Sequence, residues 1–87
     1  MTIQYKGQSR GFNYRIAEIF FDEDNAKETK LAERIANFLE KVEGYKVDCG
    51  IPSELIIVVE NHDEYEELVK TYKEAKKMFR DCMKYGF

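Results

Sequence analysis

Twice along this chain the hydrophobic pattern changes from the period of a strand to the period of a helix, and this change restricts the fold most. Residues 16–21 read IAEIFF, residues 54–60 read ELIIVVE, and an amphipathic pattern follows each run. Asn25 and Asn61 each precede a glutamate by three residues, which is the spacing of a capping box, where each side chain bonds an unpaired amide of the other residue. Each apolar run is therefore predicted to be a strand that ends shortly before a helix.

The two helical patterns have well-marked limits. Apolar residues recur at helical spacing after Asn25, and Gly44 suits the C′ position, so the first helix is predicted over about residues 25–43. Its apolar stripe consists of Leu31, Ile35, Phe38, Leu39 and Val42. A second stripe predicts a helix over about residues 62–84, and it consists of Tyr65, Leu68, Val69, Tyr72, Ala75, Phe79, Cys82 and Met83.

The N-terminal region is predicted to form a β-hairpin. Ile3 and Tyr5 alternate with polar neighbours, and a period of two returns in Phe12, Tyr14, Ile16 and Phe20. Between them, Gly7 and Gly11 bracket a polar turn, since glycine supplies the positive φ that such turns need.

Residues 45–53 decide the topology. Tyr45, Val47 and Cys49 alternate with charged residues, and residues 50–53 read GIPS, so a short strand and a turn are predicted here. The order is then ββαββα, an α+β fold with a four-stranded antiparallel sheet and two helices. The alternative is ββαβα with one parallel strand pair. We prefer the first, because a structureless connection of this length exceeds the usual length of about two to six residues.

Composition limits the class of protein. A chain of 87 residues, 44% hydrophobic and 36% charged with a net charge of −3, is expected to form a single folded domain over residues 1–87. Its longest aliphatic run, residues 55–59, is far shorter than the roughly 20 residues that span a bilayer. The N-terminal residues do not resemble a signal peptide, so we expect a cytoplasmic protein in which Cys49 and Cys82 remain thiols.

Basic residues suggest one possible function. Lys70, Lys73, Lys77, Arg80 and Lys84 form a stripe along the second predicted helix, and Lys6, Arg10 and Arg15 lie in the hairpin. Together with the aromatic rings of Tyr5, Phe12 and Tyr14 they could bind nucleic acid. In the ββαββα order, however, the acidic start of this helix lies near Lys6 and Arg10, and its basic end lies near residues 22–28. The charges then largely cancel, so nucleic-acid binding is the alternative function.

No motif points to catalysis. Cys49, His62 and Asp63 are the residue types of a thiol nucleophile, a base and an orienting acid, but seven strand residues separate Cys49 from His62 by roughly 20 Å. We expect no catalytic residue, no metal site and no cofactor. Glu18 is the one carboxylate inside an apolar strand pattern, which is a setting that raises a pKa.

Interaction with another protein is the function that the pattern favours. Both predicted long strands are apolar on both faces, and two helices on the same side would leave one face exposed. We therefore expect a small non-enzymatic interaction module, an adaptor or inhibitor of the kind that phages and mobile elements encode. It would bind a protein partner or a second copy through a sheet face or through the second helix. The candidate binding residues are Tyr5, Arg10, Phe12, Tyr14, Arg15, Ile56, Val58, Lys73, Lys77 and Arg80.

Overall fold

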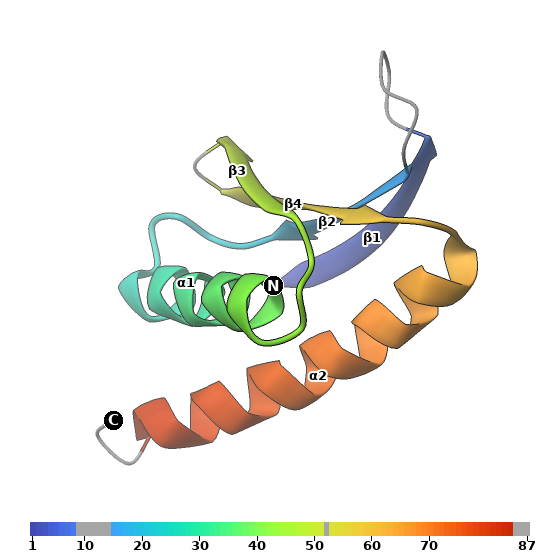
Figure 1. Cartoon of the computed structure of the whole chain (residues 1–87). Helices are drawn as coiled ribbons and strands as arrows, with labels where there is room; N and C mark the ends of the chain where they lie inside the picture. Colours follow the sequence, from blue (N-terminus) through green and yellow to red (C-terminus); the bar gives the residue numbers. More distant parts are fainter. Residues whose placement is uncertain (9–14, 52, 85–87) are drawn as a thin grey trace.

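The computed structural model describes residues 1–8, 15–51 and 53–84, and its elements follow the predicted order ββαββα (Figure 1). The strands and helices are β1 (Thr2–Gln8), β2 (Arg15–Phe20), α1 (Ala26–Lys41), β3 (Val47–Ile51), β4 (Glu54–Val59) and α2 (His62–Lys84). The candidate residues Arg10, Phe12 and Tyr14, together with Gly11, lie outside the described residues.

The four strands form one antiparallel sheet in the order β1-β2-β4-β3. In the centre, Ala17 of β2 lies opposite Ile57 of β4, and Val47 of β3 lies opposite Ile57 on its other side. Because β3 pairs with β4, the α+β fold with four antiparallel strands is confirmed, and the alternative order with a parallel strand pair is wrong.

Both helices lie on the same side of the sheet (Figure 1). On that side the central side chains Ala17, Ile19, Leu55, Ile57 and Val59 are at most 2% exposed, and they pack against the buried stripes of α1 and α2. The helices also contact each other, and the rings of Phe38 and Phe79 meet edge to face with centroids 5.9 Å apart. The single core of the described residues therefore lies between the sheet and the helices.

The N-terminus of α1 is held by more than a capping box. Asn25 is the N-cap, and its side chain accepts hydrogen bonds from the amides of Lys27 and Glu28, as predicted. Glu28 does not return a bond to Asn25. Its Oε1 accepts from the amide of Asp22 at 3.0 Å and pairs with the ammonium of Met1 at 3.0 Å. The side chain thus joins the start of β1 to the start of α1.

Asn61 caps α2 as predicted, whereas the end of α1 differs in detail from the prediction. Asn61 accepts a hydrogen bond from the amide of Glu64 at 2.8 Å, which caps α2. The C-cap of α1 is Val42, and the positive φ of 79° falls on Gly44, one position beyond C′. Val42 was expected in the apolar stripe, but its side chain is 68% exposed because the helix ends before this position turns toward the core.

Two strands, β1 and β3, extend farther into the turns that follow them than predicted. Gly7 has the expected positive φ of 67°, but it lies within β1 opposite Ile16, at a register shift, and not in the hairpin turn. Likewise β3 continues to Ile51, opposite Glu54, with a second register shift after Asp48. Pairing across the sheet thus extends each strand beyond its regular alternation.

No helix within the described ranges is both long and apolar enough to cross a membrane.

Candidate functional site

The sheet face that turns away from the helices is the first candidate site, and we call it the open face. Its central side chains come from alternate positions of β2 and β4, where Ile16 lies opposite Val58, Glu18 opposite Ile56, and Phe20 opposite Glu54. No helix of the described residues covers this face (Figure 1). Phe20, Ile56 and Val58 are half-buried, as expected for neighbours that shield only one another.

Two carboxyl groups lie among these apolar side chains. Glu54 is only 7% exposed and shares a side-chain hydrogen bond with Glu18 on the neighbouring strand. That hydrogen bond, burial and the negative charge of Glu18 together raise the pKa of Glu54 to about 7, while the Lys6 ammonium opposes the shift. The pair therefore holds a proton near neutral pH and lowers the charge that the open face carries.

Sequence reasoning identified Glu18 but missed Glu54. Glu54 is the first residue of β4 and follows a predicted turn, so the alternation of residues gave no sign that its side chain is buried. What places it beside Glu18 is the antiparallel register, because Glu54 lies two residues along β4 from Ile56, the residue opposite Glu18, and therefore on the same face of the sheet.

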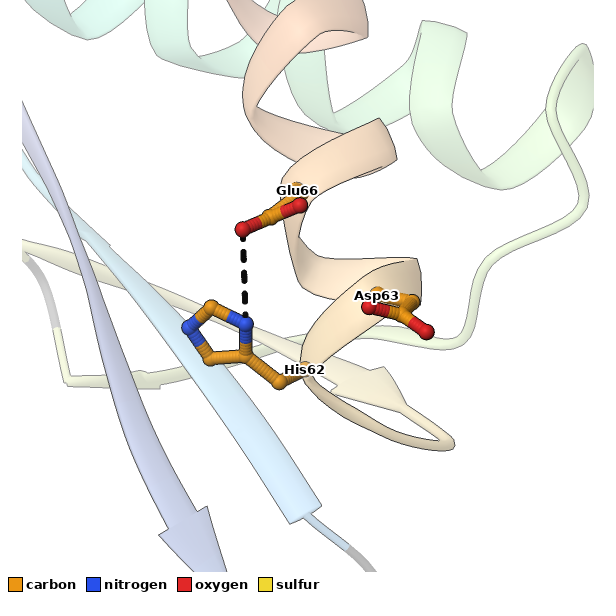
Figure 2. A group of neighbouring side chains, drawn as sticks. All are labelled: His62, Asp63 and Glu66. Carbon is orange, nitrogen blue, oxygen red and sulfur yellow. Dashed lines mark ion pairs between the residues drawn. The ribbon is translucent and has the colours of Figure 1, made fainter.

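The first turn of α2 brings together a second group, His62, Asp63 and Glu66 (Figure 2). All three residues are exposed, their ligand atoms lie within 4.8 Å of one another, and His62 Nδ1 is 3.6 Å from a carboxylate oxygen of Glu66. The sequence prediction passed over this group, although a histidine and a glutamate four residues apart share one helix face. These residue types could contact one cation, but the positive end of the helix dipole opposes a cation there.

Aromatic packing gives His62 a simpler role. Its ring meets Tyr5 of β1 edge to face at 5.1 Å and lies 5.7 Å from the ring of Tyr65. Tyr5 and Tyr65 in turn lie 5.0 Å apart. Tyr5 is thus placed against α2 and not on the open face, so its ring is part of the packing between β1 and α2.

The predicted basic surface is divided in the structure. Arg15 donates from its guanidinium to the carbonyl of Glu60 at 3.0 Å, beside the start of α2. Lys73, Lys77 and Arg80 lie farther along α2, around a cleft whose other wall is the start of β1. Arg15 and Tyr5 of the hairpin therefore adjoin the start of α2, and the cleft lies near Glu28, whose pKa the Lys76 charge lowers. The predicted position of Lys6 and Arg10 beside the acidic start of α2 stays a prediction, since Arg10 lies outside the described residues.

At the basic end of α2, nearby acidic residues neutralise the positive charge less completely than predicted. Glu28 is the carboxylate whose pKa responds to this end of the helix, and its Oε1 already binds the Asp22 amide and the Met1 ammonium. Those two bonds lower the pKa of Glu28, burial opposes them, and the charge of Lys76 adds a smaller lowering effect. Lys76 also lines the cleft, where sequence reasoning did not place it.

Comparison of the chain with protein-family models, with curated proteins and with solved structures gave no match.

Proposed function

We propose that this protein is a non-enzymatic interaction module whose open face binds a second copy of the chain. One observation carries the proposal: α1 and α2 cover the same side of the sheet, so no helix of the described part of the chain lies over the apolar residues on the other side (Figure 1). Contiguous apolar surface of this kind marks interaction sites. Two sheets packed face to face would bury it on both chains.

The charges of the open face support a second copy as the occupant. In a twofold interface the same surface meets itself, so it must carry groups that complement each other. Lys6 supplies an ammonium whose charge acts on Glu54, and Glu18 with Glu54 supplies carboxyl groups among the aliphatic side chains. An antiparallel arrangement of two such faces would set the Lys6 of each chain against the acids of the other.

Protonation makes this match closer. With a pKa of about 7, Glu54 is largely protonated in slightly acidic solution, and each face then has one carboxylate and one ammonium. A face with balanced charge is less costly to remove from water than one with two carboxylates. Association is therefore expected to strengthen as the pH falls from 8 to 6.

An adaptor or inhibitor role for the dimer and a cytoplasmic location belong to the same proposal. Cys82 is a free, half-buried thiol, which suits a reducing compartment.

Nucleic-acid binding is supported by a different observation, the cations around the cleft on α2.

The test is the mass of the protein in solution, measured by sedimentation equilibrium over a wide range of concentration. The wild-type chain is expected to approach twice its monomer mass, and Ile56→Lys is expected to stay monomeric because a charge replaces the centre of the face. Val42→Lys is the matched control, since Val42 is equally aliphatic but exposed at the end of α1, and it should dimerise normally.

A second variant covers the case in which Ile56→Lys does not fold. Lys6 is exposed, so Lys6→Glu should leave the fold intact while setting like charges against each other in the dimer. A wild-type chain that stays monomeric at every concentration would refute the second copy. Capture of a different protein that Ile56→Lys no longer binds would then identify the face as a site for that partner.

A further inference from the structure

A cleft of about 420 Å³ lies between the start of β1 and the second half of α2, and we call it the basic cleft. It is on the helix side of the molecule, so it is separate from the open face. Its volume is within the range of about 300–1,000 Å³ that small-molecule sites occupy. It is lined by Met1, Thr2, Ile3, Tyr72, Lys73, Lys76, Lys77 and Arg80.

Four of these side chains are cations that form no ion pair with an acid in the described part of the chain. Among the described residues, no ion pair involves Lys73, Lys76, Lys77 or Arg80. Their helical spacing of three and four residues explains how α2 brings them to one wall. Glu28 sits nearby, but its charge is already matched by the Met1 ammonium. The basic cleft therefore carries a positive charge that the described part of the chain does not neutralise.

Tyr72 provides a second and independent sign of a ligand. Its side chain lines the basic cleft and is only 3% exposed, yet its hydroxyl oxygen has no hydrogen-bond partner among the described residues. Buried hydroxyls in native proteins nearly always have a partner, because an unpaired one loses its bond to water and gains nothing.

The surroundings of Tyr72 define what that partner must be. Burial raises the pKa of Tyr72, the charge of Glu28 raises it further, and Arg80 partly opposes the shift. The hydroxyl therefore keeps its proton and acts as a donor at neutral pH. Lys76 Nζ lies 5.7 Å from the centroid of the same ring. A ligand that approaches Tyr72 meets a hydrogen-bond donor next to cations, so it must be an anion that accepts hydrogen bonds.

We propose that the basic cleft binds a phosphate group. A phosphate has the charge to engage several cations at once, and its oxygens accept paired bonds from a guanidinium such as that of Arg80. Lys73 and Lys77 would contribute point charges, and the Tyr72 hydroxyl would move slightly to donate to an oxygen. The phosphate could belong to a small phosphorylated compound or to the backbone of a nucleic acid, and both present the same chemistry.

The experiment uses inorganic pyrophosphate as the probe and follows amide shifts of the ¹⁵N-labelled chain, which carries no N-terminal tag. Saturable binding is expected, with the largest shifts at residues 1–3 and 72–80. Arg80→Ala should weaken binding about tenfold, which is the effect of losing one charge-assisted contact. Lys41→Ala removes one positive charge from an exposed position of α1, outside the basic cleft and outside the predicted basic stripe, and it should leave the affinity unchanged.

Tyr72→Phe tests the hydroxyl apart from the charge. The variant keeps the ring and all four cations, so a loss of affinity would assign the hydroxyl to the ligand. If Tyr72→Phe and Arg80→Ala both bind pyrophosphate as the wild type does, or if Lys41→Ala weakens binding as much as Arg80→Ala, the proposal is overturned. The absence of saturable binding would overturn it as well.

A second titration distinguishes the two sources of phosphate. Labelled single-stranded and duplex oligonucleotides are titrated by fluorescence anisotropy at low and moderate salt. Binding that pyrophosphate displaces and Arg80→Ala weakens would assign the site to nucleic acid. Saturable pyrophosphate binding without oligonucleotide binding would assign it to a small phosphorylated compound. The mass measurement for the open face is independent of both results.

Discussion

Glu54 of β4 shares a hydrogen bond with Glu18 of β2 on the open face, and the pKa of Glu54 is raised to about 7. The pairing of β2 with β4 thus brings two carboxyl groups together, and one proton bound by the pair relieves the repulsion between their negative charges. A proton held by the folded state and released by the unfolded state couples stability to pH.

We predict that the free energy of unfolding falls as the pH rises from 4.5 to 7. In the unfolded chain Glu54 has its ordinary pKa of 4.5, so between the two values the folded state binds more protons and loses stability with rising pH. The loss is expected to be about 1–3 kcal/mol, because each pKa unit corresponds to about 1.4 kcal/mol. Urea unfolding at pH 5 and pH 7.5 measures it.

Glu54→Gln should remove this loss, since the amide still donates to Glu18 and carries no charge. The variant is expected to be more stable than the wild type at pH 7.5 and to show a flatter profile. Glu33→Gln makes the same change at an exposed position of α1 and serves as the control. Equal slopes for the wild type and Glu54→Gln would contradict the assignment of the proton to this pair.

Glu28 is expected to have the opposite effect on the acid side. Its pKa is lowered, chiefly by the bond from the Asp22 amide and by the Met1 ammonium, so its contribution is present above pH 4.5 and lost as the pH falls. Glu28→Gln should cost about 1 kcal/mol at pH 6, which is the worth of a typical hydrogen bond, and much less at pH 3. Thermal unfolding at both pH values compares the variants, and a cost that does not change with pH would refute the ionic contribution.

The two N-caps offer a test of local structure. Asn25→Ala and Asn61→Ala each remove a side-chain acceptor for helix amides, and each is expected to cost about 1 kcal/mol. Asn37→Ala places the same substitution in the exposed middle of α1, where alanine is the better helix former and stability should rise slightly. Urea unfolding of the three variants provides the comparison, and equal effects at positions 25 and 37 would disprove the cap.

Tyr72→Phe is expected to stabilise the protein when no anion is added. The substitution removes a buried hydroxyl that has no partner among the described residues, and relief of that cost is worth about 1 kcal/mol. Addition of pyrophosphate should then stabilise the wild type more than the variant, because binding to the folded state alone raises its stability. Thermal melts with and without pyrophosphate measure both effects, and a destabilised variant would mean that the hydroxyl already has a partner.

Local patterns in the sequence predicted the element order and much of the core correctly. Asn25 and Asn61 mark the starts of both helices, because capping depends on residues within one turn. The apolar positions of α1 and α2 were read from helical spacing alone, and all those whose side chains the structure describes, except Val42, are buried or half-buried. Errors occur where a pattern ends: Val42 continues the spacing but lies beyond α1, and Gly7 lies inside β1.

The candidate sites required contacts between distant parts of the chain. Glu18 was found from its strand, but Glu54 became its partner only through the register of β2 and β4. The cations of α2 were visible in the sequence, whereas the start of β1 that completes the basic cleft was not. The unpaired hydroxyl of Tyr72 has no local signal, since tyrosine at that spacing reads as an ordinary core residue.

The identity of the strands and helices, their order, and the apolar positions of each helix could be read from the sequence, because these properties follow from neighbours along the chain. By contrast, the placement of both helices on one side of the sheet is a property of the folded chain that no local pattern predicts. That placement depends on how the two helices pack against each other and on the sheet, and it exposes the open face and brings four cations of α2 beside the start of β1. The register of β2 and β4, which also pairs distant parts of the chain, joins Glu18 to Glu54.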